Sequence, residues 1–262
     1  MHSKQSAKIG IQMFGEFSIT INGNTLTNLK GRTKRVWMLI QYLVARRNHP
    51  SSINQLLQNI WDGRECGDPE NALKNLVYRA RALLRDLSGD QSQFIIFLNG
   101  TYAWNNQYAC WVDAEQFLRC ADKAFSTRAS EEKRIRWYQK AVRLYQGEFL
   151  PKSSYSTWVI LQNERYAKIY SRCVCGLCRL LAAQGRFEEM IPVCQSALRL
   201  FPYEEPFHIL LLQAYSNIGQ KGMAFDYYNQ TVKVFYQEFG VDLSGLFRPY
   251  FSGIPESGRL QT

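Results

Sequence analysis

The residues best suited to chemistry are the cationic and amide side chains between positions 71 and 85. This segment reads NALKNLVYRARALLR and contains no acidic residue. Its apolar positions 73, 77, 80 and 84 would share one side of a helix, because the intervals are four, three and four residues. Lysine and arginine bind phosphate oxygens, and asparagine and arginine pair with base edges. The pattern therefore predicts a helix that packs by one face and contacts nucleic acid by the other, whereas a merely solvated helix more commonly mixes charge signs.

The exposed side chains are expected to divide into two roles on double-stranded DNA. The candidates for base contacts in the major groove are Lys74, Asn75, Tyr78 and Arg79, with Arg79 the candidate for guanine. The candidates for phosphate contacts are Asn71, Arg81 and Arg85 on the same helix, Arg32, Lys34 and Arg35 at the start of an earlier helix, and Asn99 and Thr101 in a hairpin. For Lys34 and Arg35 the alternative is surface charge that serves solubility.

Other chemistry has little support. The three histidines lie far apart at positions 2, 49 and 208, and no phosphate-binding loop, nucleophile elbow or zinc-protease motif occurs. Cys173, Cys175 and Cys178 form a C-x-C-x-x-C run that could suggest zinc, but it lies in a long helical pattern without nearby partner ligands. We expect the cysteines to pack as small apolar residues. No catalytic residue, metal or cofactor is predicted.

The elements before the basic segment are expected to position it. Residues 9–14, 17–22 and 25–29 have the alternation and turns of a small strand meander. Apolar residues then recur at helical spacing over 32–46, and a second helix, capped by Ser51 or Ser52, extends to Trp61. Asp68 and Pro69 supply a cap and a first-turn proline for the third helix.

A hairpin is expected directly after the third helix. The apolar runs 94–98 and 101–104 flank Asn99 and Gly100, and Asn-Gly is the strongest short hairpin signal. Three helices followed by such a hairpin have the order of a winged helix, in which the second and third helices form the helix-turn-helix.

The remainder is expected to be all helical. Helices are predicted over 113–124, 130–146, 156–184, 187–200, 204–218 and 221–239. Gly185 and Gly219 are 34 residues apart, and each ends a helix that is followed by another of similar length. This period is typical of tetratricopeptide repeats, whose stacked helices form protein-binding surfaces. A third, degraded repeat is expected around 118–145.

Composition is consistent with a polyanionic partner but does not identify one. The net charge is +10, and residues 1–107 carry 13 Lys and Arg against 7 Asp and Glu, whereas residues 108–262 carry 19 against 15. The N-terminal part is thus the more basic for its length. No apolar run approaches a membrane span, and the polar start shows no signal peptide, so we expect a cytoplasmic protein without a membrane partner.

Several of these segments together resemble the antibiotic-regulatory-protein type of transcriptional activator, which has an OmpR-like winged helix followed by a bacterial transcriptional activation domain. The motifs are RTKRVWMLIQYL (32–43), INQLLQNIW (53–61), NALKNLVYRARALL (71–84), NGTYAW (99–104), WVDAEQF (111–117), QGRF (184–187) and QEFGVDLSGL (237–246). The resemblance covers about residues 9–250. The family pattern usually has Leu where Ala80 stands and a basic residue where Ala82 stands.

The resemblance implies a fold and a function. The fold class would be mostly α with small β elements: a winged helix-turn-helix over 8–108, an all-α tetratricopeptide-like domain over 109–250 and a flexible tail over 251–262. Family members bind direct repeats on DNA as side-by-side protomers and recruit RNA polymerase, so a homodimer or such protomers are expected here. The alternative is an interaction adaptor whose winged helix does not read DNA sequence. An enzyme is the less favoured class, as is an RNA-binding protein.

Overall fold

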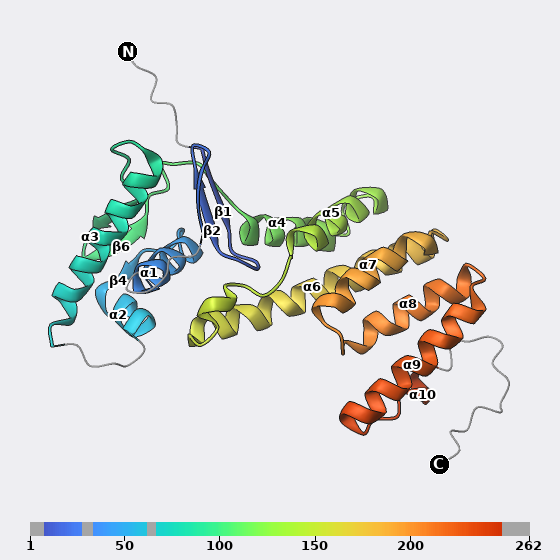
Figure 1. The fold of residues 1–262 in the computed structure, drawn as a ribbon. Helices are drawn as coiled ribbons and strands as arrows, with labels where there is room; N and C mark the ends of the chain where they lie inside the picture. Colours follow the sequence, from blue (N-terminus) through green and yellow to red (C-terminus); the bar gives the residue numbers. More distant parts are fainter. Residues whose placement is uncertain (1–7, 28–33, 62–66, 248–262) are drawn as a thin grey trace. The chain divides into compact units, whose positions relative to one another are not determined.

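The computed structural model describes residues 8–27, 34–61 and 67–247, which fall into two compact units (Figure 1). We call residues 1–118 and 144–167 the N-terminal unit, and residues 119–143 and 168–262 the C-terminal unit. Helices α4 (Asp113–Phe125) and α6 (Thr157–Ala183) contribute residues to both units. The sequence boundary at residue 108 stays a prediction, and the expected tail over 251–262 lies outside the described residues.

Two small sheets lie in the N-terminal unit. The first has the order β3-β2-β1-β7, in which β7 runs parallel to β1 and the other pairs are antiparallel. The second has the order β4-β6-β5. Their bounds are β1 Ile9–Gln12, β2 Ser18–Ile21, β3 Asn24–Thr27, β7 Cys110–Val112, β4 Ser51–Ser52, β6 Thr101–Trp104 and β5 Ile95–Leu98. The predicted meander and hairpin are therefore present, and β4 and β7 are additions that the sequence did not predict.

The winged helix-turn-helix consists of α1 (Lys34–Ala45), α2 (Ile53–Trp61), α3 (Pro69–Ser88) and the β5–β6 hairpin. Ser52 caps α2, as predicted: its hydroxyl accepts from the Gln55 N–H at 3.2 Å, and the Gln55 side chain accepts from the Ser52 N–H at 2.9 Å. This reciprocal pair satisfies two donors that a helix start would leave open. α1, α2 and α3 each pack against the other two.

A buried carboxylate closes the N-terminal unit. Asp113 is 4% exposed, and its two oxygens accept from the backbone N–H groups of Met13 at 2.8 Å and Phe14 at 3.0 Å. Burial raises the pKa of Asp113 to about 6, although these N–H groups act in the opposite direction. The ring of Phe14 lies 5.4 Å from that of Phe117 and 5.1 Å from that of Tyr166. The N-terminal strands are thereby tied to segments about a hundred residues later.

The C-terminal unit is helical. Its further helices are α5 (Glu131–Leu144), α7 (Phe187–Leu200), α8 (Glu205–Asn217), α9 (Lys221–Phe239) and α10 (Ser244–Phe247). α7 packs against α8 and α8 against α9, and Figure 1 shows these three in orange and red. The bounds agree with the predicted helices to within two residues, except for α10, which the sequence did not predict.

The 34-residue repeat is confirmed by matching helix ends. Gly185 and Gly219 both have positive φ, 70° and 78°, which glycine adopts without steric cost. After each glycine, the next N–H bonds back to a carbonyl five residues earlier, from Arg186 to Leu181 at 2.9 Å and from Gln220 to Tyr215 at 3.1 Å. Residues buried at the same offset include the pairs Val174 and His208, Leu177 and Leu211, Cys178 and Leu212, Met190 and Ala224, and Ala197 and Thr231.

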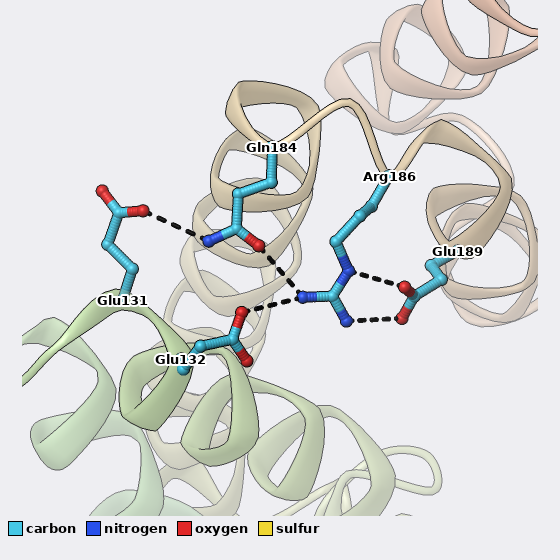
Figure 2. A network of polar contacts seen from close by, with 5 residues as sticks. All are labelled: Glu131, Glu132, Gln184, Arg186 and Glu189. Carbon is cyan, nitrogen blue, oxygen red and sulfur yellow. Dashed lines mark hydrogen bonds and ion pairs between the residues drawn. The ribbon is translucent and has the colours of Figure 1, made fainter.

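Arg186 joins this repeat to α5 (Figure 2). Its guanidinium binds both oxygens of Glu189 at 2.6 and 3.0 Å, and one Nη donates to Glu132 at 3.1 Å. The same Nη donates to Gln184 at 3.0 Å, whose amide in turn donates to Glu131 at 3.2 Å. These side chains are largely exposed, so the network adds little to stability.

Candidate nucleic-acid interface

Helix α3 is held at both ends. Asp68 accepts from the Asn71 N–H at 3.0 Å, and Gly89 ends the helix with a φ of 70°. The β2–β3 turn covers the last carbonyls, because the Asn24 amide donates to Leu87 at 3.2 Å and the Asn22 amide to Ser88 at 3.5 Å. No local signal in the sequence connects these two asparagines with α3. A helix fixed in this way keeps its outer face in one orientation.

The inner and outer faces of α3 are divided as the spacing predicts. Leu73, Val77, Ala80 and Leu84 are all 2% exposed or less, and Leu76 joins them. All the predicted base-contacting residues are exposed on the opposite face, and Tyr78 is 68% exposed. These residues are Lys74, Asn75, Tyr78 and Arg79. Cationic, amide and aromatic side chains are thus exposed together on one face, which makes this face the candidate site.

The predicted phosphate-contacting residues on α3 are placed unequally. Asn71 and Arg85 are exposed on the outer face. Arg81 is half-buried, and its Nε donates to the carbonyl of Ile95 in β5 at 3.0 Å. Arg81 thus ties the wing to α3, which leaves only the rest of its guanidinium for a phosphate.

The candidates outside α3 lie on α1 and in the wing. Arg35 lies over the Trp61 ring at 5.3 Å, and Lys34 lies over the Tyr155 ring at 4.3 Å. Asn99 occupies the turn of the hairpin with a φ of 49°, and the Thr101 hydroxyl donates to Leu98 at 2.8 Å. Arg32 lies outside the described residues. Both α1 cations therefore have aromatic neighbours that the sequence did not reveal.

One further basic ridge was missed. Lys133, Arg136, Lys140 and Arg143 on α5 are all exposed and follow intervals of three, four and three residues. The spacing rule that found the α3 face would have found this one. Its context differs, because Glu131 and Glu132 begin the same helix and belong to the Arg186 network. In the described part of the chain, α5 is followed by further helices and not by a β-hairpin.

The cysteines lie mainly in the core. Cys173, Cys178 and Cys194 are fully buried, and burial raises the pKa of Cys173 to about 12. Among the described residues no group of three or more His, Cys, Asp or Glu side chains is placed to hold a metal ion. Within the same residues, no helix has the length and apolarity needed to cross a membrane.

The family described as bacterial transcriptional activator domain matches residues 112–250. The chain belongs to this family. The transcriptional regulatory protein MoaR1 of Mycobacterium bovis (strain BCG / Pasteur 1173P2) is 19% identical over 269 residues, which cover 97% of this chain and 81% of MoaR1. These findings confirm the resemblance to activators of the antibiotic-regulatory-protein type. The chain is a transcriptional regulator of the bacterial transcriptional activator domain family, and the relatives are regulators rather than enzymes.

A solved structure supports the fold class. Mycobacterium tuberculosis EmbR, in complex with a low-affinity phosphopeptide, has a TM-score of 0.69 with this chain at 18% identity. The likeness covers 93% of this chain and 64% of the EmbR chain. The predicted class, mostly α with small β elements, is confirmed by this likeness, and the bacterial transcriptional activator domain match includes the 34-residue repeat.

Proposed function

We propose that this bacterial transcriptional activator domain protein is a sequence-specific double-stranded DNA-binding regulator that inserts α3 into the major groove. The observation that carries the proposal is the outer face of α3, which is cationic and amide-rich and has no acidic residue between positions 71 and 85. A helix about 30 Å long, anchored by one apolar face, fits a groove about 12 Å wide. The wing that follows α3 would lie beside the DNA backbone.

Two groups of side chains would contact the DNA, one at the bases and one at the phosphates. Lys74, Asn75, Tyr78 and Arg79 would contact base edges, and their common exposure supports this role. Phosphates would be held by Asn71, Arg81 and Arg85 on α3, by Arg32, Lys34 and Arg35, and by Asn99 and Thr101 in the wing. Phosphate contacts position the helix and give the salt dependence, whereas base contacts give the sequence preference.

The test is a binding titration on an operator obtained by genome-wide binding or by selection from random DNA. Arg79→Ala should weaken specific binding by about 1–3 kcal/mol and relax the preference at one base pair. Arg85→Ala should weaken binding to every sequence alike and lower the salt slope by about 1. Arg128→Ala is the matched control, because Arg128 is exposed in the α4–α5 loop, outside α3.

Two outcomes would reject the assignment. Unchanged affinity and preference in Arg79→Ala would remove that residue from base recognition. Weak binding that does not depend on salt would favour the second class, an adaptor whose winged helix contacts protein.

We also propose that protomers bind side by side on direct repeats and that the helical repeats contact RNA polymerase, from a cytoplasmic location. Exposed apolar side chains on α9 support a protein-binding surface, since Tyr236 and Phe239, three residues apart on the helix, are 60% and 52% exposed. Tyr236→Ser should lower transcription from the operator with purified polymerase while DNA affinity stays unchanged. If transcription and DNA affinity fell equally, Tyr236 would instead serve contacts between protomers or the stability of the fold.

A further inference from the structure

A cavity of about 300 Å³ lies in the N-terminal unit beside α1, away from the outer face of α3. Its lining comes from the β1–β2 turn, from α1 and from the segment around the short 3-10 helix η2 (Pro151–Ser153). The volume is at the lower end of small-molecule sites, which span about 300–1,000 Å³. The cavity is therefore large enough for a small organic molecule.

The floor of the cavity is apolar and rigid. Phe17, Trp37 and Met38 are each 7% exposed or less. The Phe17 and Trp37 rings meet edge to face with centroids 4.9 Å apart, and the Tyr155 hydroxyl contacts the Met38 sulfur at 2.9 Å. Leu150, which also lines the cavity, has a φ of 49°, a strained conformation for a leucine. Such a floor favours a flat or compact apolar body.

One buried polar group is left with unused hydrogen-bonding capacity at the cavity. Gln41 is 4% exposed and lines it, and its side-chain oxygen accepts from the Ser153 hydroxyl at 2.8 Å. Its amide nitrogen donates to no residue in the described part of the chain. The amide nitrogen is nevertheless a hydrogen-bond donor, so it suits a ligand that supplies an oxygen.

The mouth of the cavity carries a small excess of positive charge. Lys34 and Lys152 line it together with Glu16. Lys152 pairs with Glu16 at 2.9 Å with both side chains more than half exposed, whereas the Lys34 ammonium lies 4.3 Å from the Tyr155 ring centre. The described residues that line the mouth thus carry a net charge of +1, which suits an anionic group such as a carboxylate.

We propose that this cavity binds a small aromatic monocarboxylate. The ring would lie on Trp37 and Met38, and the carboxylate would accept from the Gln41 amide and pair with Lys34. Because α1 packs against α3, an occupied cavity would alter the support of α3 and hence DNA affinity. This last step alone rests on the proposed DNA-binding function.

The experiment uses the full chain, with phenylacetate as the probe and its neutral analogue phenylacetamide as the reference. Calorimetric titration should show saturable phenylacetate binding that is about tenfold tighter than that of phenylacetamide. Lys34→Gln should weaken phenylacetate binding by about fivefold and leave the amide unchanged. Glu16→Gln should strengthen phenylacetate binding by about twofold to fivefold, because a competing carboxylate is removed.

Lys221→Gln is the matched control, since Lys221 is exposed on α9 and does not line the cavity. Circular dichroism checks that each variant is folded. If Lys34→Gln is not folded, phenylacetate binding to Lys152→Gln is measured in its place. Absence of saturable binding, equal binding of acid and amide, or equal effects of Lys34→Gln and Lys221→Gln would overturn the site.

A separate titration measures DNA affinity with and without saturating phenylacetate. A change would support coupling through α1, and no change would reject the coupling while the calorimetric result stands. If Lys34→Gln left phenylacetate binding unaltered, the cavity proposal would be wrong, whatever the effect of this change on DNA binding. Calorimetry tests the cavity even if the protein does not bind DNA. The ligand-binding proposal and the DNA-binding proposal can therefore be rejected independently.

Discussion

The N-terminal unit and the C-terminal unit are held together by contacts of different range. In the N-terminal unit, Asp113 bonds the backbone of Met13 100 residues earlier, and Ser153 bonds Gln41 112 residues earlier. In the C-terminal unit, Ser171 bonds Glu204 at a separation of 33, and His208 bonds Tyr227 at a separation of 19. The N-terminal unit is therefore held together by contacts between segments far apart in the sequence. The C-terminal unit is held together mainly by contacts between helices that are neighbours in the sequence.

The proposed function gives a reason for this difference. A reading helix must be held rigidly against several segments, because a base contact fails when its donor is displaced. Stacked repeats need only nearest neighbours and expose a long surface.

The largest effect is expected from Asp113→Ala in the N-terminal unit. The change leaves the N–H groups of Met13 and Phe14 buried without their acceptor, which should cost about 3 kcal/mol of unfolding free energy. Urea denaturation measures the loss, and hydrogen exchange should place it in β1 and β7 and not in α8 or α9. Asp113→Asn keeps one acceptor oxygen and should lose less. If hydrogen exchange rose equally in both units of Asp113→Ala, the two units would not be stabilised independently, and this prediction would be wrong.

The next effect is expected from Gly176→Ala in the C-terminal unit. A methyl group at this position in α6 would lie 2.7 Å from the ring of Tyr138, which is buried, so we expect a loss of about 1–3 kcal/mol. The control is Gly222→Ala at the start of α9, where a methyl group meets nothing within 4 Å and should stabilise the helix by up to about 1 kcal/mol. Thermal denaturation compares the two variants. A stabilised Gly176→Ala would show that α5 and α6 are not packed this closely.

The pH response should have opposite signs in the two units. Burial lowers the pKa of His208, which bonds Pro202 and Tyr227, so its stabilising contribution is present above about 6.5 and is lost as the pH falls through the lowered value. The raised pKa of Asp113 has the reverse effect: its contribution is full below the ordinary value of 3.8 and is lost as the pH rises through about 6.

Hydrogen exchange between pH 4 and 7 tests this contrast, after correction for the intrinsic rates. Protection of α8 should fall toward low pH and become less pH-dependent in His208→Gln. Protection of β1 should fall toward high pH, with the dependence reduced in Asp113→Asn. The same sign in both units would reject the assignment of these two groups.

The smallest effect is expected from Arg186→Met. The Arg186 network is exposed, and solvent and salt screen such ion pairs strongly. The melting temperature should change little, and the residual change should disappear at high salt. A large change that persists in salt would show that this network, and not the apolar repeat core, holds α5 to the repeat.

The bounds of the repeat helices could be predicted to within two residues, because the sequence features that mark them are local. Gly185 and Gly219 mark helix ends by their own conformational freedom, and the apolar spacing of each helix marks its buried side. The outer face of α3 followed from the same spacing. The strand β7 was missed because it has only three residues, and its pairing partner lies about a hundred positions earlier.

The candidate site was predicted as a list of residues but not as a set of contacts. Arg81 was expected at a phosphate, yet its Nε donates to the wing, and Arg35 lies over Trp61. A sequence does not show which aromatic ring or carbonyl a flexible cationic side chain reaches, because that partner is brought near by the fold. The capping of α3 by Asn22 and Asn24 was invisible for the same reason.

The sequence by itself determined the helices, their buried sides, the repeat period and the acid-free face of α3. These properties depend on residues within one or two turns of each other, and local periodicity records them directly. Only the tertiary structure decided the Asp113 closure, the strand β7 and the cavity beside α1. Each of these joins segments about a hundred residues apart. Each therefore forms only if the packing free energy exceeds the entropy cost of closing a long loop, and no local sequence pattern records that difference.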